Sequence, residues 1–156
     1  MAEETGPLSI ECDGYLQLFI SLAEKKKELG LSVTLNVGGM LITGLLISTT
    51  EYLDGVATLV SDYFAKMGAT PDQVKSIEEG FSLRRVISEG VEKYTTAMAK
   101  GLPLPPPNTH AYIHLKNVRF YAPSQSPWTH PPGLLWRGKA SAVDGFLLGE
   151  LSITPA

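Results

Sequence analysis

The chain has almost no cysteine, no long apolar run and no basic N-terminus. Cys12 is the single cysteine among 156 residues, which excludes an internal disulfide and a cysteine-based zinc cage. No run of about 20 apolar residues is present to span a bilayer, and the longest apolar stretch, residues 40–47, is interrupted by Thr43 and Gly44. The first residues carry acids where an export signal carries lysine or arginine. We therefore expect a cytoplasmic protein that has no membrane partner.

A strong excess of charge is also absent. The 13 basic and 16 acidic side chains give a formal net charge of -3, which argues against an electrostatic grip of the whole domain on nucleic acid. Hydrophobic residues make up 44% of the chain, enough to exclude a mainly disordered protein. The length suits one domain over residues 1–156. We expect the partner of this domain to be a protein.

Motifs for catalysis or metal binding are missing as well. The sequence has no G-x-S-x-G, P-loop or G-x-G-x-x-G motif. His110 and His114 are four residues apart, but the alternation around them predicts a strand, which separates them by roughly 13 Å. They cannot share a metal ion within one strand, and two surface imidazoles are the simpler interpretation. The sequence therefore predicts a non-enzymatic protein without catalytic residues, cofactor or metal.

Two parts of the chain have the apolar repeat of an amphipathic helix. The first covers residues 11–29 and stops at Gly30. Its predicted apolar stripe consists of Tyr15, Leu18, Phe19, Leu22 and Leu29. The second is a helical insert over about residues 51–100, in which Thr70 and Gln73 have the spacing of a capping box around a fresh helix start at Pro71. A proline-rich connector, residues 102–108, follows the insert.

The remaining segments predict strands. Residues 31–37 alternate apolar and polar side chains, as in a half-buried strand, and Gly38 and Gly39 supply a tight turn into a second strand. Gly44 in that second strand indicates a bend or bulge. A long strand follows the connector, and its alternation slips by one residue near Lys116-Asn117, where we expect a bulge.

The last two predicted strands, residues 134–143 and 146–153, are expected to form a hairpin at Asp144-Gly145. The order of elements then predicts an α+β fold. Its sheet is a small five-stranded antiparallel β barrel, or a curved sheet, with an N-terminal helix and a helical insert after the second strand. The first hairpin resembles the first motif of Sm-like proteins, and the Arg137-Gly138 strand resembles part of their second.

Two features are candidates for contact with a partner. One is the apolar stripe of the helical insert, represented by Leu53, Val56, Val60 and Phe64. Such a stripe is core in one interpretation and a contact between subunits in the other, and the second predicts a homo-oligomer. The other feature is Trp128 in a proline-rich loop, which is either a binding anchor or a side chain folded back over the barrel mouth.

Three blocks of the sequence together resemble the gas vesicle accessory protein GvpU family. They are LNVGGMLITGLLISTTEYLD (residues 35–54), IHLKNVRFY (113–121) and LLWRGKASAVDGFLLGELS (134–152), roughly a third of the chain. The third block is the most specific, because Trp136, Arg137 and Gly138 precede Asp144, Gly145 and Phe146 at a fixed distance. The resemblance implies a non-catalytic protein that acts in gas vesicle assembly, stability or clustering, with the vesicle shell or other gas vesicle proteins as partners.

The role of Arg137 and the functional class each have an alternative. Arg137 can offer its guanidinium to a carboxylate, with Asp144 as the expected partner, or it is an ordinary exposed arginine on a strand. The rival functional class is an Sm-like RNA-binding protein. Against this alternative, the residues after the second predicted strand, STTEYLD, lack the Asp and Asn that the Sm-like RNA pocket uses, and the net charge is acidic.

Overall fold

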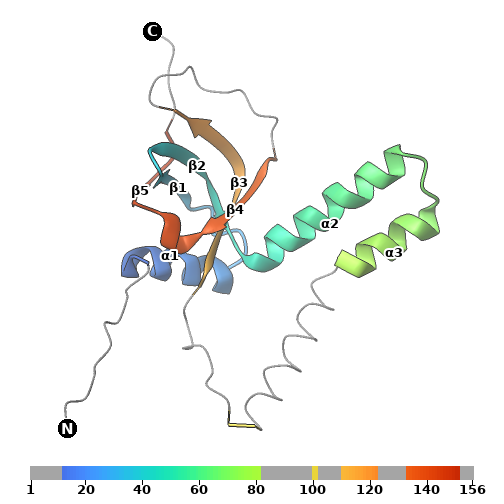
Figure 1. Cartoon of the computed structure of the whole chain (residues 1–156), viewed down its shortest axis with the longest axis horizontal. Helices are drawn as coiled ribbons and strands as arrows, with labels where there is room; N and C mark the ends of the chain where they lie inside the picture. Colours follow the sequence, from blue (N-terminus) through green and yellow to red (C-terminus); the bar gives the residue numbers. More distant parts are fainter. Residues whose placement is uncertain (1–11, 82–99, 102–109, 123–132, 152–156) are drawn as a thin grey trace.

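The structure, a computed structural model, describes residues 12–81, 100–101, 110–122 and 133–151. Within these residues, three α-helices accompany one five-stranded antiparallel sheet (Figure 1). The elements are α1 (Gly14–Lys25), β1 (Ser32–Val37), β2 (Met40–Ile47), α2 (Thr49–Lys66), α3 (Pro71–Phe81), β3 (Tyr112–Tyr121), β4 (Leu135–Lys139), the short 3-10 helix η1 (Ala140–Ala142) and β5 (Gly145–Leu148). Trp128, the connector at 102–108 and residues 82–99 of the predicted insert lie outside the described residues.

The sheet has the strand order β4-β3-β2-β1-β5 and is open. Strand β4 pairs with β3, and β5 pairs with β1 at the opposite edge. The α+β class, the N-terminal helix and the helices after β2 are confirmed. The barrel alternative is wrong, because the two edge strands do not pair with each other, and the curved-sheet alternative describes the fold.

The turn between β1 and β2 follows directly from its two glycines. Gly38 and Gly39 have φ angles of 58° and 82°, the positive values that a type I′ hairpin turn requires. Asn36 Oδ1 accepts a hydrogen bond from the Gly39 amide at 3.1 Å. The predicted turn is confirmed.

A bulge in β3 faces a glycine in β2. Thr43 pairs with Arg119 and Leu45 pairs with Lys116, so two residues of β3 oppose the single residue Gly44. Asn117, one of these two, has a φ of 54°. A Cβ on Gly44 would lie 2.9 Å from the carbonyl oxygen of Lys116. Both predictions, the irregular Gly44 and the slip near Lys116-Asn117, are confirmed.

Helix α1 covers the core with a different face from the predicted one. It begins after Asp13, whose Oδ1 accepts hydrogen bonds from the first-turn amides of Tyr15 and Leu16. The buried residues of the helix are Leu16, Ile20 and Ala23. Three residues of the predicted stripe are exposed, namely Tyr15, Leu18 and Leu22. Both rows have helical spacing, so periodicity alone could not choose between them.

The other face of the β1–β2 hairpin is covered by the segment after β5. Thr34 and Thr43 face each other in register and are buried, with their hydroxyl oxygens 3.0 Å apart. The Thr34 hydroxyl donates to the Gly149 carbonyl at 2.9 Å, and the Leu151 amide donates to Thr43 Oγ1 at 3.2 Å. The polar face of β1, which the alternation assigned to solvent, is therefore buried at Thr34.

The expected hairpin at Asp144-Gly145 is not formed. After β4 the chain turns through η1 and crosses to the other edge, where Gly145 pairs with Asn36 of β1. Gly145 lies outside the left-handed region of φ, so it makes no type I′ turn. The strands β4 and β5 were expected as neighbours from their sequence separation, but three strands separate them.

Candidate interaction surface

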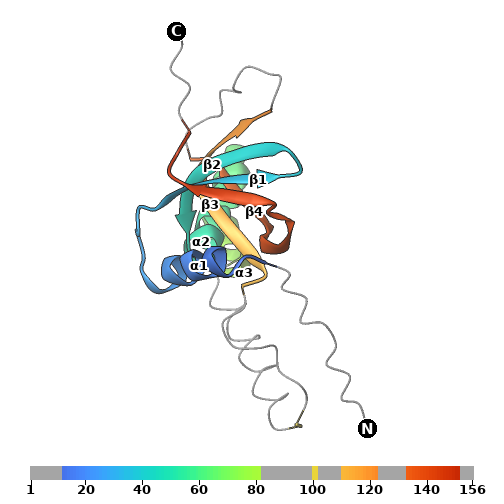
Figure 2. The same cartoon turned by 90° about the vertical axis from the view of Figure 1, so that its left-hand side faces the viewer.

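Helices α2 and α3 form a helical hairpin that leaves the sheet and extends away from it (Figure 1; Figure 2 gives the view turned by 90°). We call this hairpin the arm, and we call α1 with the five strands the body. The two arm helices pack on each other, and only α2 makes extensive contact with the sheet. The arm therefore presents much of its surface away from the body.

The base of α2 is fixed to the body by polar contacts. Ser48 caps the helix, and its Oγ accepts a hydrogen bond from the Glu51 amide at 3.1 Å. Glu24 of α1 accepts two hydrogen bonds at this helix N-terminus, from the amide of Thr49 at 2.8 Å and from its hydroxyl at 2.6 Å. Glu51 forms an ion pair with Lys116 of β3. These contacts hold the arm at one place on the sheet.

His114 lies beneath the base of α2. Its side chain is 3% exposed, and its ring centroid is 4.6 Å from that of Tyr52. Burial lowers the pKa of the imidazole to about 4, the positive charge of Arg137 acts in the same direction, and Glu24 opposes it. Its Nδ1 has no hydrogen-bond partner among the described residues. The expectation of a surface imidazole is therefore wrong for His114.

The far end of the arm has the predicted helix start. Gly68 ends the connection from α2 with a φ of 90°, a conformation that favours glycine. The Thr70 hydroxyl oxygen accepts a hydrogen bond from the backbone N–H of Gln73 at 3.4 Å. In return, Gln73 Oε1 accepts a hydrogen bond from the backbone N–H of Thr70 at 2.9 Å. This reciprocal pair is the predicted capping box, and it confirms the helix start at Pro71.

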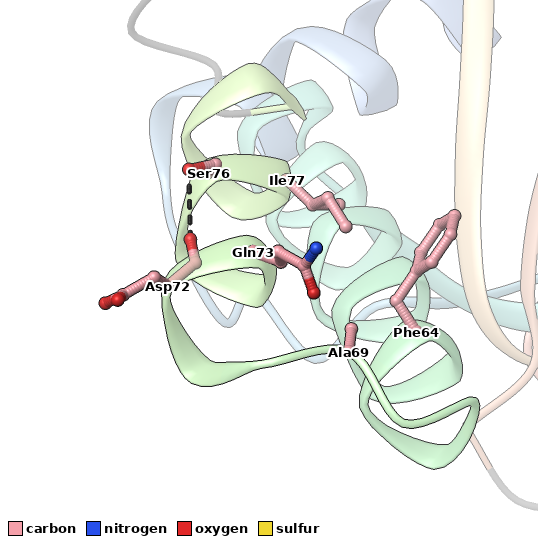
Figure 3. A pocket seen from close by; sticks show the side chains of 6 residues that line it. All are labelled: Phe64, Ala69, Asp72, Gln73, Ser76 and Ile77. Atoms are coloured by element: carbon pink, nitrogen blue, oxygen red, sulfur yellow. Dashed lines mark hydrogen bonds between the residues drawn. The ribbon is translucent and has the colours of Figure 1, made fainter.

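A groove of about 510 Å³ lies between the two helices near the tip of the arm. Figure 3 shows Phe64 and Ile77 pointing into it from α2 and α3, while the Asp72 carboxylate points outward at its edge. The residues that line the groove are Phe64, Ala69, Asp72, Gln73, Ser76 and Ile77. The groove is thus mainly apolar, with a carboxylate at the rim.

The apolar stripe predicted for the insert lies along α2 but is not in the core. Its first three residues, Leu53, Val56 and Val60, are half-buried, and Phe64 is exposed. Beside the stripe, three large apolar side chains form an exposed row that reaches the C-cap of α2: Leu59 is 56% exposed, Tyr63 60% and the C-cap Met67 70%. We call these three the arm row. None of the stripe belongs to the buried core cluster.

Trp136, Gly138 and Phe146 of the third sequence block take part in the packing of the body. Trp136 packs against the core, and its ring lies over Gly138, where a Cβ would clash with Cη2 of the ring. Phe146 of β5 meets Phe19 of α1 edge to face, with ring centroids 6.0 Å apart. Phe146 thus joins β5 to α1 and Trp136 packs β4 on the core, packing roles that sequence reasoning did not assign.

Arg137 and Asp144 do not pair. The Asp144 carboxylate accepts a hydrogen bond from the Gly38 amide at 2.7 Å and so supports the β1–β2 turn. The Arg137 guanidinium lies over the ring of Tyr112, 3.9 Å from its centroid. Tyr112 and Glu24 were missed as contact residues, because an alternating strand and a charged helix give no signal of their tertiary neighbours.

In the described part of the chain, no three His, Cys, Asp or Glu side chains gather as a metal site. Within the same residues, no helix is both long and apolar enough to cross a membrane. The described residues thus have two exposed apolar helix surfaces, the arm row beside its groove and the Tyr15, Leu18 and Leu22 side of α1.

Comparison with known proteins agrees with the resemblance of the three sequence blocks. A family model described as gas vesicle protein GvpU-like matches residues 13–151. The matched range includes every described helix and strand, so it covers the body and the arm together. A search of curated proteins and a search of solved structures gave no match. The chain belongs to the GvpU-like family of gas vesicle proteins.

Proposed function

We propose that this gas vesicle protein is a non-enzymatic, cytoplasmic accessory factor. It acts in the assembly, stability or clustering of gas vesicles through self-association and through binding to vesicle proteins. The family assignment supports the vesicle as the place of action. The exposed arm row on α2 supports a role in protein contact, because three neighbouring large apolar side chains remain open to solvent there in the monomer.

The energetics favour the arm row as a contact surface. Leu59, Tyr63 and Met67 are each more than half exposed on a helix that leaves the sheet. Full burial of one large apolar side chain contributes about 1.5–3 kcal/mol. Three neighbouring side chains therefore offer several kcal/mol to a partner. Copies that bind each other as well as the shell would bridge vesicles by multivalency, even if each contact were weak.

The test compares a charge placed in the arm row with the same charge elsewhere on α2. Tyr63→Glu should weaken binding at least ~10-fold, because a carboxylate is costly in a dry apolar contact. Ala65→Glu is the matched control, since Ala65 is also exposed but lies outside the row. Co-flotation with purified gas vesicles measures vesicle binding, and light scattering measures mass relative to the 16.9 kDa monomer.

Two outcomes would contradict the proposal. Wild-type protein that neither floats with vesicles nor exceeds the monomer mass at tens of micromolar would remove both kinds of contact. Equal binding by Tyr63→Glu and wild type would remove the arm row from the contact. The half-buried Val60 gives a second probe, because Val60→Glu should dissociate an oligomer that uses this side of α2 while the β-sheet signal in circular dichroism persists.

A further inference from the structure

A small cationic and aromatic patch lies on the outer part of β3 and β4. Tyr112 is 38% exposed, and the central carbon of the Arg137 guanidinium lies over its ring, 3.9 Å from the ring centroid. Lys139 is opposite Tyr112 in the strand register and is exposed, as is Arg137. Among the described residues, neither cation forms an ion pair with a carboxylate. We call Tyr112, Arg137 and Lys139 the Tyr112 patch.

The chemistry of this patch suits carboxylate groups. A guanidinium that stacks on a ring keeps its N–H groups directed outward around its edge, where they can bind a carboxylate in bidentate fashion. Lys139 adds a second positive charge on the same face of β4, because it lies two residues beyond Arg137. The positive charge of Arg137 also acts on the buried His114, because it contributes to lowering the pKa of that imidazole. A partner with two or more carboxylates could therefore bind both cations of the patch at once.

The arm of the same protein has the complementary charge. Residues 49–81 contain six acidic side chains and two lysines, a net charge of -4. Two of these acids are already engaged, Glu51 with Lys116 and Glu78 with the Ser61 hydroxyl at 2.9 Å. Asp72 and Glu79 on α3 are exposed and seven residues apart, so they lie on one side of the helix, where the exposed Lys75 between them offsets part of their charge. Asp72 also stands at the rim of the apolar groove.

We propose that the Tyr112 patch of one copy docks on α3 of a second copy, with Arg137 and Lys139 facing the carboxylates of Asp72 and Glu79. This inference rests on the self-association proposed above and adds to the arm row a second, charged contact between copies. The contact is between copies, because α3 packs on α2 and lies well apart from β4 within one chain (Figure 1).

The two surfaces are different, so the contact is heterologous. Each copy then has one patch and one α3 surface, and copies join head to tail in open chains unless the rotation closes a ring. Chains of this kind expose many copies of the arm row at once. Such repetition gives the multivalency that bridging of vesicles requires.

The experiment is a charge reversal with rescue, measured by sedimentation velocity of the full chain. The variant Arg137→Glu/Lys139→Glu should associate at least ~10-fold more weakly than wild type, and so should Asp72→Lys/Glu79→Lys, because each sets like charges against each other. A chain with all four substitutions restores complementarity and should associate as wild type does. A mixture of the two double variants should also associate. Raised salt should weaken association of the wild type.

The matched control is Lys26→Glu/Lys27→Glu, which changes the net charge as the patch variant does but lies after α1, away from the patch. This control should associate like wild type, and circular dichroism should show that all variants are folded. If wild type associates and the patch variant does so equally well, or if the fourfold variant is not rescued, the docking is refuted while the proposed function stands. A monomeric wild type refutes both the docking and self-association. Tight RNA binding that depends on the patch would assign it to nucleic acid and also refute the docking.

Discussion

Acidification should destabilise this protein through His114. In the folded state, burial and the charge of Arg137 lower the pKa of this imidazole from 6.5 to about 4. The unfolded chain regains the ordinary pKa, so between pH 6.5 and about 4 the unfolded state binds a proton that the folded state does not. Stability is therefore greatest above pH 6.5 and falls as the pH is lowered toward 4. At about 1.4 kcal/mol per pH unit, the loss approaches about 3 kcal/mol.

The assay is urea unfolding of wild type and His114→Phe at pH 7 and at pH 4. Phenylalanine keeps a ring against Tyr52 but cannot titrate. The carboxylates contribute equally to the pH dependence of both proteins. On acidification the free energy of unfolding of wild type should therefore fall by about 2–3 kcal/mol more than that of the variant. An NMR titration reports the imidazole directly, and Arg137→Gln should raise the pKa of His114. Equal pH dependence of wild type and variant, or a titration of His114 near pH 6.5, would refute the reasoning.

Two further predictions concern the bulge and the base of the arm. Gly44→Ala should lower the free energy of unfolding by about 1–3 kcal/mol, because its Cβ would meet the Lys116 carbonyl at 2.9 Å. In the same denaturant titrations, Gly145→Ala should stay within about 0.5 kcal/mol of wild type, because its Cβ meets nothing within 4 Å. Glu24→Ala removes the acceptor for the Thr49 amide and hydroxyl, and should cost about 2 kcal/mol and speed amide exchange in the first turn of α2. Unchanged amide exchange in the first turn of α2 would show that Glu24 does not fix this helix to the body.

Much of the local structure was predictable from the sequence. The Gly38-Gly39 turn, the bulge opposite Gly44 and the capping box at Thr70 all depend on residues that are neighbours in the chain or that have special backbone angles. Such features are encoded within a few residues, so composition and spacing suffice to find them. The resemblance of three short sequence blocks also led to the correct family.

The candidate site was predictable only in part. The sequence identified the apolar stripe of α2 but could not say whether the rest of the chain covers it. It identified Arg137 and gave two interpretations, an exposed strand arginine or a partner of Asp144, the second because the expected hairpin would have kept the two residues close in space. The structure moves β5 to the far edge of the sheet, so that Asp144 binds the Gly38 amide and Arg137 stacks on Tyr112.

Most element types, the Gly38-Gly39 turn, the Thr70 capping box and the family of this protein follow from the sequence alone, whereas the chain reversal predicted at Asp144-Gly145 does not form. Tertiary contacts select Leu16 and Ile20 over Tyr15 and Leu18 as the buried residues of α1, because the helix is apolar on two sides. Strand order and the burial of His114 and Thr34 were likewise decided by contacts between distant segments. Local periodicity records which faces can be buried, whereas the actual burial depends on which segments meet when the sheet, α1 and the base of α2 pack together.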